Sequence, residues 1–176
     1  MERPATYHPI TKSFHWLIVA MVSAEFAIGW LMPEIRRSTS PAELVSFHMS
    51  FGILILGVML IRLILRFFHT APSPEPGMPW WQELAANWIH ILLYASVIAL
   101  PLTGWLLASA HGWALNIFGY FSVPALVSAS TRMEQLADSA HVATAAIVAI
   151  LIGLHVLAAL YHHYILRDGV LRRMLP

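Results

Sequence analysis

The sequence contains no cysteine, and charged residues are scarce. A chain without cysteine can form no disulfide framework, no thiolate metal site, no cysteine-ligated iron–sulfur cluster and no thiol nucleophile. Any metal or cofactor must therefore be held by histidine, methionine or oxygen ligands. Charged residues make up 11% of the chain, whereas soluble domains average about 25%. Because 59% of the residues are hydrophobic, composition alone predicts a membrane protein.

A strong charge excess and internal repeats are also missing. The formal net charge is +1, and no cluster of lysine and arginine is interleaved with aromatic residues, so we expect no nucleic-acid partner. The first apolar stretch shows no evident small-residue cleavage site, which favours a retained membrane span over a signal peptide. The 176 residues are enough for a single domain, residues 1–176, and no repeat is visible within it.

The sequence instead contains long hydrophobic runs. Four apolar stretches are each long enough to cross a membrane as a helix. They cover residues 14–32, 47–68, 88–108 and 141–166. Capping boxes at residues 40–43, with proline at the first helical position, and at residues 131–134 mark the starts of the second and fourth helices. We predict an all-α membrane protein with a bundle of four transmembrane helices.

The connections and the basic residues indicate how the bundle is oriented. Residues 69–83 contain four prolines and predict an irregular linker, whereas the aromatic loop 109–130 is expected to lie on the membrane surface or to cap the bundle. Basic residues gather on the cytoplasmic side of membrane proteins, which predicts that both termini are cytoplasmic. Seven would lie on that inner side and three on the outer: Arg3, Lys12, Arg62, Arg66, Arg167, Arg172 and Arg173, against Arg36, Arg37 and Arg132.

Ten histidines stand out in a chain so poor in polar residues. His141 and His155 are fourteen residues apart in one stretch, which is nearly four helical turns, so both side chains share one face about 21 Å apart. With the predicted topology, His15 lies at the depth of His155, and His48 lies at the depth of His141. We call His15 and His155 the inner pair, and His48 and His141 the outer pair. Histidine inside a membrane is costly and indicates function.

Two histidines at one depth on different helices can clamp a haem from both faces. Such ligation leaves the iron no open position, which favours electron transfer over oxygen binding. We therefore predict two haem groups, with His15 and His155 on the inner iron and His48 and His141 on the outer iron. Small residues follow three of these ligands by one turn and would leave room for a flat ring: Gly52, Ala145 and Ala159.

Four other side chains are candidates for supporting roles. His90, on the third helix, competes as an inner ligand. Arg62 follows His48 by fourteen residues and could meet an inner haem propionate or a lipid headgroup. His162 is either an interfacial residue or a proton donor to a quinone at the inner haem. Glu25 lies mid-span, and we favour a hydrogen bond inside the bundle over a proton relay.

Short segments along nearly the whole chain resemble the bacterial cytochrome b561 family, which are four-helix membrane proteins with two b-type haems. These are SFHW at residues 13–16, FHM at 47–49, IALPLTG at 98–104, GLH at 153–155, YHHY at 161–164 and LRRMLP at 171–176. The resemblance implies that His15, His48, His141 and His155 are haem ligands. It also implies a bacterial inner-membrane protein that passes electrons from superoxide on the periplasmic side to ubiquinone, with the region of His162 and Arg62 as a candidate quinone site.

Two other functions stay open. A quinol-oxidising cytochrome would keep the haems and reduce a separate periplasmic redox partner. A histidine-lined zinc or proton transporter would use the same histidines without haem, although Glu25 is the one acid within the four apolar stretches. Haem absorbance distinguishes the transporter from the cytochromes, and the direction of electron flow distinguishes the two cytochromes.

Overall fold

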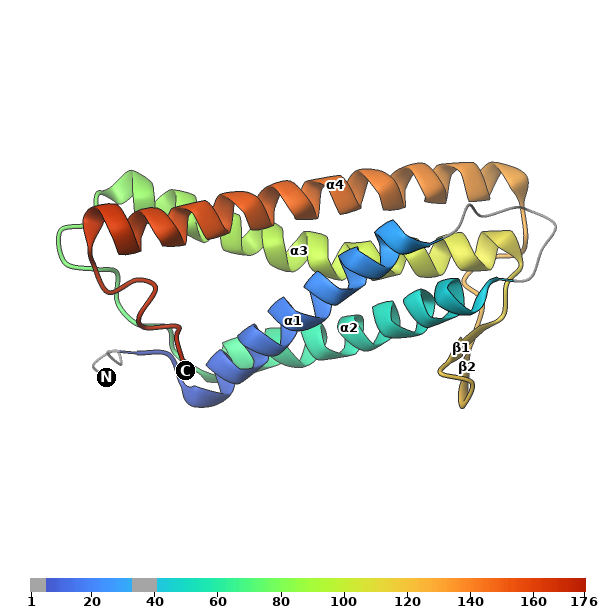
Figure 1. The fold of residues 1–176 in the computed structure, drawn as a ribbon, viewed down its shortest axis with the longest axis horizontal. Coiled ribbons are helices and arrows are strands. Elements are labelled where there is room, and N and C mark those ends of the chain that lie inside the picture. Colours follow the sequence, from blue (N-terminus) through green and yellow to red (C-terminus); the bar gives the residue numbers. More distant parts are fainter. Residues whose placement is uncertain (1–5, 33–40) are drawn as a thin grey trace.

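The computed structural model, which describes residues 6–32 and 41–176, consists mainly of four long helices (Figure 1). All four are long and apolar enough to span a membrane, as the sequence predicted. Their bounds are α1 (Pro9–Leu31), α2 (Glu43–Phe68), α3 (Trp80–His111) and α4 (Thr131–Tyr161). Each helix begins before its apolar stretch, because the first turns are polar or interfacial and still helical. The predicted linker is correspondingly shorter, since residues 80–83 belong to α3.

The helix starts refine the capping predictions. α4 begins at Thr131 as predicted, but its N-cap is Ser130, whose hydroxyl accepts a hydrogen bond from the Met133 backbone. α2 begins at Glu43 with Ala42 as its N-cap and no side-chain cap. Proline is therefore not at the first helical position of α2, and residue 40 of the predicted box lies outside the described residues.

The helices pack in sequence order. α3 lies between α2 and α4, and α1 packs on α2 and crosses the bundle obliquely (Figure 1). In the described ranges, the backbone of α4 makes no close contact with α1 or α2. Side chains from α1 and α2 must therefore reach across this space to meet those of α4.

The buried core lies halfway along the bundle. It joins side chains from all four helices: Met21, Val22, Ile55, Met59, Val97 and Val148. Val148 is fully buried and lies seven residues from both His141 and His155. An apolar layer thus separates the two depths at which the histidine pairs were predicted.

The loop after α3 contains a short antiparallel hairpin that the sequence analysis did not predict. Strand β1 (Leu115–Ile117) pairs with β2 (Phe121–Val123) through a turn in which Phe118 and Gly119 have φ of 47° and 80°. Two successive positive φ angles define the turn that matches the twist of a hairpin, and glycine adopts them readily. The turn was missed because phenylalanine, rather than asparagine or aspartate, precedes the glycine.

The hairpin is attached to α2 by one buried serine. Ser50 is 2% exposed, and its hydroxyl faces the carbonyl oxygens of Ser46 and Asn116 at 2.8 and 2.9 Å. The same oxygen accepts a hydrogen bond from the Phe118 backbone at 3.1 Å. The loop is therefore held against α2 at one end of the bundle. Of the two positions predicted for residues 109–130, this favours the cap.

The chain returns to the opposite end after a π-helical turn, η1 (His162–Leu166). The last residues fold back so that the chain ends close to the start of α1 (Figure 1). The Lys12 ammonium donates to the Leu175 carbonyl at 2.7 Å, and the Trp16 indole donates to the Met174 carbonyl at 3.0 Å. These contacts cover the bundle end at which the inner pair was predicted.

Candidate functional site

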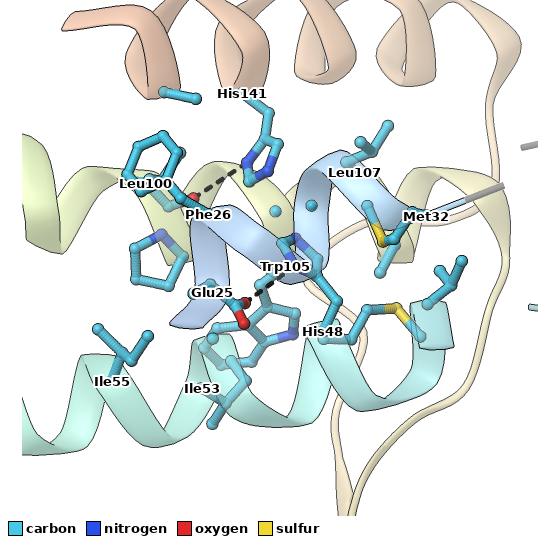
Figure 2. Close-up of a pocket in the computed structure, with 18 of the residues that line it drawn as sticks. Glu25, Phe26, Met32, His48, Ile53, Ile55, Leu100, Trp105, Leu107 and His141 are labelled. Carbon is cyan, nitrogen blue, oxygen red and sulfur yellow. Dashed lines mark hydrogen bonds and ion pairs between the residues drawn. The ribbon is translucent and has the colours of Figure 1, made fainter. Parts of the chain in front are cut away.

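His48 of α2 and His141 of α4 meet across the bundle. Their ring centres are 6.2 Å apart and their planes are perpendicular. Figure 2 shows both rings pointing into the same interior space, from helices whose backbones make no close contact with each other. The predicted outer pair is thus brought together.

The ring of His141 is oriented by α3. Its Nδ1 lies 3.1 Å from the Leu100 carbonyl oxygen (Figure 2) and 3.1 Å from the Thr103 hydroxyl. A carbonyl oxygen can only accept, so Nδ1 must carry the proton. In the neutral ring, Nε2 then has a free lone pair, which is the form that binds a metal. Sequence reasoning missed both partners, although they lie in the run at residues 98–104.

A glycine of α3 lets this ring approach closely. A Cβ placed on Gly104 would lie 3.0 Å from Cε1 of His141, which is tighter than most real Cβ contacts, so the ring would have to move. This close approach at Gly104 was missed in the sequence. Its geometric role is to make room for the imidazole.

His48 has a carboxyl group as its neighbour. Oε1 of Glu25 lies 3.0 Å from Nδ1 of His48, although the contact is not aligned as a hydrogen bond. The other carboxyl oxygen is buried without a hydrogen-bond partner, and the Glu25 side chain is 13% exposed. A carboxylate behind the distal nitrogen of a histidine is a common second partner in metal sites. Glu25 therefore belongs to the outer site.

A cavity of about 440 Å³ lies beside the outer pair, within the range of ligand pockets. All four helices contribute to its wall, which includes both histidines and Glu25. Small residues line it as well, among them the predicted Gly52 and Ala145, with Gly29 and Gly104 in addition. The shallow neighbours expected for a flat ring are therefore present at this site.

The inner pair also meets, and a third histidine joins it. The rings of His15 and His155 are 6.3 Å apart, with planes at 74°. His90 of α3 lies 5.4 Å from His155. All three rings are half-buried. His90 is therefore a close neighbour of the inner pair.

Both predicted pairs have the separation that a shared metal ion requires. A metal–imidazole bond is about 2 Å and a ring nitrogen lies about 1.1 Å from its ring centre, so two opposed imidazoles on one metal have centres about 6.3 Å apart. The outer and inner separations of 6.2 and 6.3 Å match this value. The 5.4 Å between His90 and His155 is shorter. Residues 6–32 and 41–176 contain no group of three His, Asp or Glu side chains placed to hold a bare metal ion.

Arg62 is bound to groups that lie one helical turn from His15 and from His90. Its Nε donates to the Tyr94 hydroxyl at 3.1 Å, and its Nη1 donates to the Thr11 carbonyl at 3.2 Å. The guanidinium also lies 5.8 Å from the centre of the Tyr94 ring. Tyr94 was missed in the sequence, where a tyrosine inside an apolar stretch gives no specific signal.

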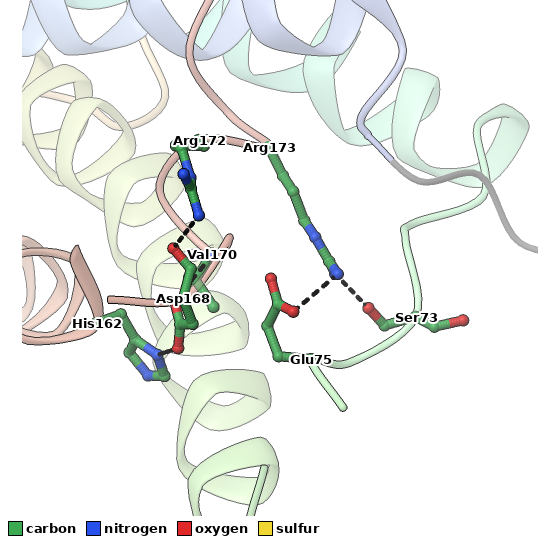
Figure 3. Close-up of polar contacts among 7 residues, drawn as sticks. All are labelled: Ser73, Glu75, His162, Asp168, Val170, Arg172 and Arg173. Atoms are coloured by element: carbon green, nitrogen blue, oxygen red, sulfur yellow. Dashed lines mark hydrogen bonds and ion pairs between the residues drawn. The ribbon is translucent and has the colours of Figure 1, made fainter. Parts of the chain in front are cut away.

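His162 is paired with an acid of the C-terminal tail. Its Nδ1 lies 2.5 Å from Oδ2 of Asp168, and Oδ1 of the same carboxylate accepts from the Val170 backbone (Figure 3). Nearby, Arg173 pairs with Glu75 at 3.1 Å and donates to the Ser73 carbonyl. The tail therefore joins η1 to the linker between α2 and α3. The outer Arg36 and Arg37 lie outside the described residues.

The chain matches a family of known proteins over almost its full length. The family model described as "Prokaryotic cytochrome b561" matches residues 6–176. Cytochrome b561 homolog 2 of Escherichia coli (strain K12) is 32% identical over 98% of this chain and 92% of its own, and homolog 1 is 34% identical over 92% of each. A probable superoxide oxidase, CybB, of Yersinia pestis is 33% identical over 97% of this chain and 96% of its own.

Proposed function

The chain belongs to the prokaryotic cytochrome b561 family, whose members are multi-pass membrane proteins of electron transfer, and we propose that it carries electrons through two haem b groups from superoxide to ubiquinone. The observation that carries this proposal is the meeting of two histidine pairs, at 6.2 and 6.3 Å, on either side of an apolar layer. The name of the relative from Yersinia pestis supports the choice of superoxide.

The four paired histidines would hold the two groups. His48 and His141 would bind the outer one, and His15 and His155 the inner one. Each bound haem b would supply one-electron oxidation and reduction with no open position for oxygen. We assign His90 to packing beside the inner group, because its 5.4 Å separation from His155 is shorter than the 6.3 Å of the proposed pair. Leu100 and Thr103 keep the proton of His141 on Nδ1, leaving Nε2 for the metal.

The overall reaction balances with two superoxide ions for each quinone. Each superoxide loses one electron on the periplasmic side and becomes dioxygen. One ubiquinone takes both electrons and two protons from the cytoplasm and becomes ubiquinol. The excess of basic residues at the end that holds both termini supports placing that end in the cytoplasm, in the bacterial inner membrane.

His162 would deliver a proton to the quinone. Asp168 accepts a hydrogen bond from Nδ1 of His162, which leaves Nε2 for a second partner. Arg62 is the other candidate at this end, for the quinone or for a haem propionate. Changing His162 to Ala should slow quinone reduction several-fold and leave the haem content unchanged. Stopped-flow measurement of the reoxidation of reduced protein by a ubiquinone analogue tests this, and an unchanged rate would remove His162 from the site.

The first experiment is an absorbance spectrum of the purified, oxidised protein before and after a pulse of superoxide. We expect about two haems per chain and rapid appearance of the reduced bands. Bands that stay oxidised until quinol is added would reverse the direction of flow and indicate a periplasmic protein partner. A colourless protein whose transport of zinc or protons depends on His48 would instead support the transporter.

A further inference from the structure

The chain reverses direction shortly after His162 and returns to this residue. The π-helical turn η1 ends at Leu166, and Arg167 then adopts a left-handed conformation with φ of 54°. After this reversal, the backbone N–H of Asp168 donates to the His162 carbonyl at 3.2 Å. The carboxyl group of Asp168 reaches the imidazole of the same histidine (Figure 3). Asp168 is therefore attached to His162 both by its backbone and by its side chain.

Both oxygens of the Asp168 carboxyl group are in contact with a nitrogen. Oδ2 lies 2.5 Å from Nδ1 of His162, and Oδ1 accepts from the Val170 backbone at 3.0 Å. Arg172 donates to the backbone carbonyl of Asp168 at 3.3 Å, which holds the residue from the other side. Because a carboxylate can only accept, Nδ1 of His162 carries the ring proton.

The second nitrogen of this imidazole is free to meet a ligand. Within residues 6–32 and 41–176, Nε2 of His162 forms no hydrogen bond, and it is not buried. The side chains of His162 and Asp168 are 13% and 20% exposed, so their contact is partly shielded from water. A carboxylate on Nδ1 orients a histidine for proton transfer at Nε2 and stabilises the protonated ring.

We propose that Asp168 is a positioning residue of the quinone site, which holds His162 by Nδ1 so that Nε2 faces a quinone carbonyl oxygen. The inference rests on the role proposed for His162 above. Two electrons from superoxide and two protons convert the quinone to quinol. One proton comes from Nε2 of the protonated ring, where the N–H bond breaks as an O–H bond forms on the quinone. The other proton comes from the cytoplasm, which also reprotonates the ring.

The test is the rate at which a water-soluble ubiquinone analogue reoxidises the reduced holoprotein, followed by stopped-flow haem absorbance. Asp168→Asn should slow this reaction several-fold, because an amide has no charge to stabilise the protonated ring. Its haem content and its reduction by superoxide should not change, since neither uses His162. Asp168→Glu keeps the carboxylate and should react faster than Asp168→Asn. An unchanged rate in Asp168→Asn, or equal slowing in both variants, would overturn the proposal.

A double variant shows whether Asp168 acts through the histidine. If it does, His162→Ala combined with Asp168→Asn should reoxidise at the rate of His162→Ala alone. A double variant slower than both single variants would overturn the positioning role. Slowing in His162→Ala with the original rate in Asp168→Asn would contradict this inference alone. An unchanged rate in His162→Ala would overturn it together with the role proposed for His162.

Glu75→Gln is the matched control for loosening of the C-terminal tail. It also changes a carboxyl group to an amide and removes the ion pair with Arg173, but it leaves the contact between Asp168 and His162 in place. We expect the original rate, and slowing equal to that of Asp168→Asn would overturn the proposal. If Asp168→Asn does not assemble, Asp168→Ser replaces it, because its hydroxyl can still accept from the Val170 backbone without carrying a charge.

Discussion

Each histidine of the outer pair has its own polar neighbour, whereas the inner pair lies beside a third imidazole and an arginine. His141 is held by a carbonyl and a hydroxyl of α3, and His48 touches the carboxyl group of Glu25. At the inner end, the ring of His90 lies 5.4 Å from that of His155, and Arg62 donates to groups one helical turn from His15 and His90. The two sites thus have nearly the same ring separation and different polar neighbours.

The two ends of the bundle also close differently. The outer end is covered by a hairpin attached to α2 through a buried hydroxyl, and the inner end by a tail held by ion pairs and carbonyls near the surface. A buried hydrogen bond left unmade costs more than a partly exposed ion pair. The outer cover should therefore be the more rigid one, and the inner cover the easier one to displace.

The largest expected effect is on haem content, and it distinguishes the proposed inner ligand His15 from its neighbour His90. His15→Ala should lower the haem content from about two to about one per chain, because one face of the inner iron loses its ligand. His90→Ala should keep about two. The haem-to-chain ratio from a pyridine haemochromogen spectrum measures both. Loss of a haem in His90→Ala but not in His15→Ala would show that His90, and not His15, is the inner ligand.

A smaller effect is expected where α3 makes room for the outer ring. Gly104→Ala places a methyl group 3.0 Å from His141 and should destabilise the protein by about 1–3 kcal/mol through overpacking, with loss confined to the outer haem. Gly153→Ala meets nothing within 4 Å and should stabilise its helix by about 0.5–1 kcal/mol. Thermal unfolding followed by haem absorbance compares them. Equal behaviour of the two variants would contradict the close approach at Gly104.

The smallest expected effects are on the free energy of unfolding, and they compare the hairpin at the outer end with the C-terminal tail at the inner end. Ser50→Ala leaves the Phe118 backbone N–H of the hairpin without its hydroxyl partner and should lower the free energy of unfolding by about 1–3 kcal/mol. Glu75→Gln removes the ion pair with Arg173 and should cost less than about 1 kcal/mol. Denaturant unfolding in detergent measures both. A larger loss in Glu75→Gln would reverse the order of rigidity between the two ends.

Much of the architecture follows from local sequence pattern. The lengths of the four apolar runs predicted the spans, and the fourteen-residue spacing of His141 and His155 predicted two depths along one helix face. Depth predicted that the members of both pairs meet, and they do, but it did not decide between His15 and His90 as the neighbour of His155. The hairpin at 115–123 was missed because its turn lacks the residues that normally mark one.

The sequence by itself determined the membrane-spanning class and the depths of the four histidines, because hydrophobic run length and helical periodicity fix position along the membrane normal. Only the tertiary structure decided the neighbours of each ring: the Leu100 carbonyl at His141, Glu25 at His48 and His90 at His155. These contacts depend on how far each helix is rotated about its own axis. That rotation results from the packing of all four helices together, and no single segment encodes it.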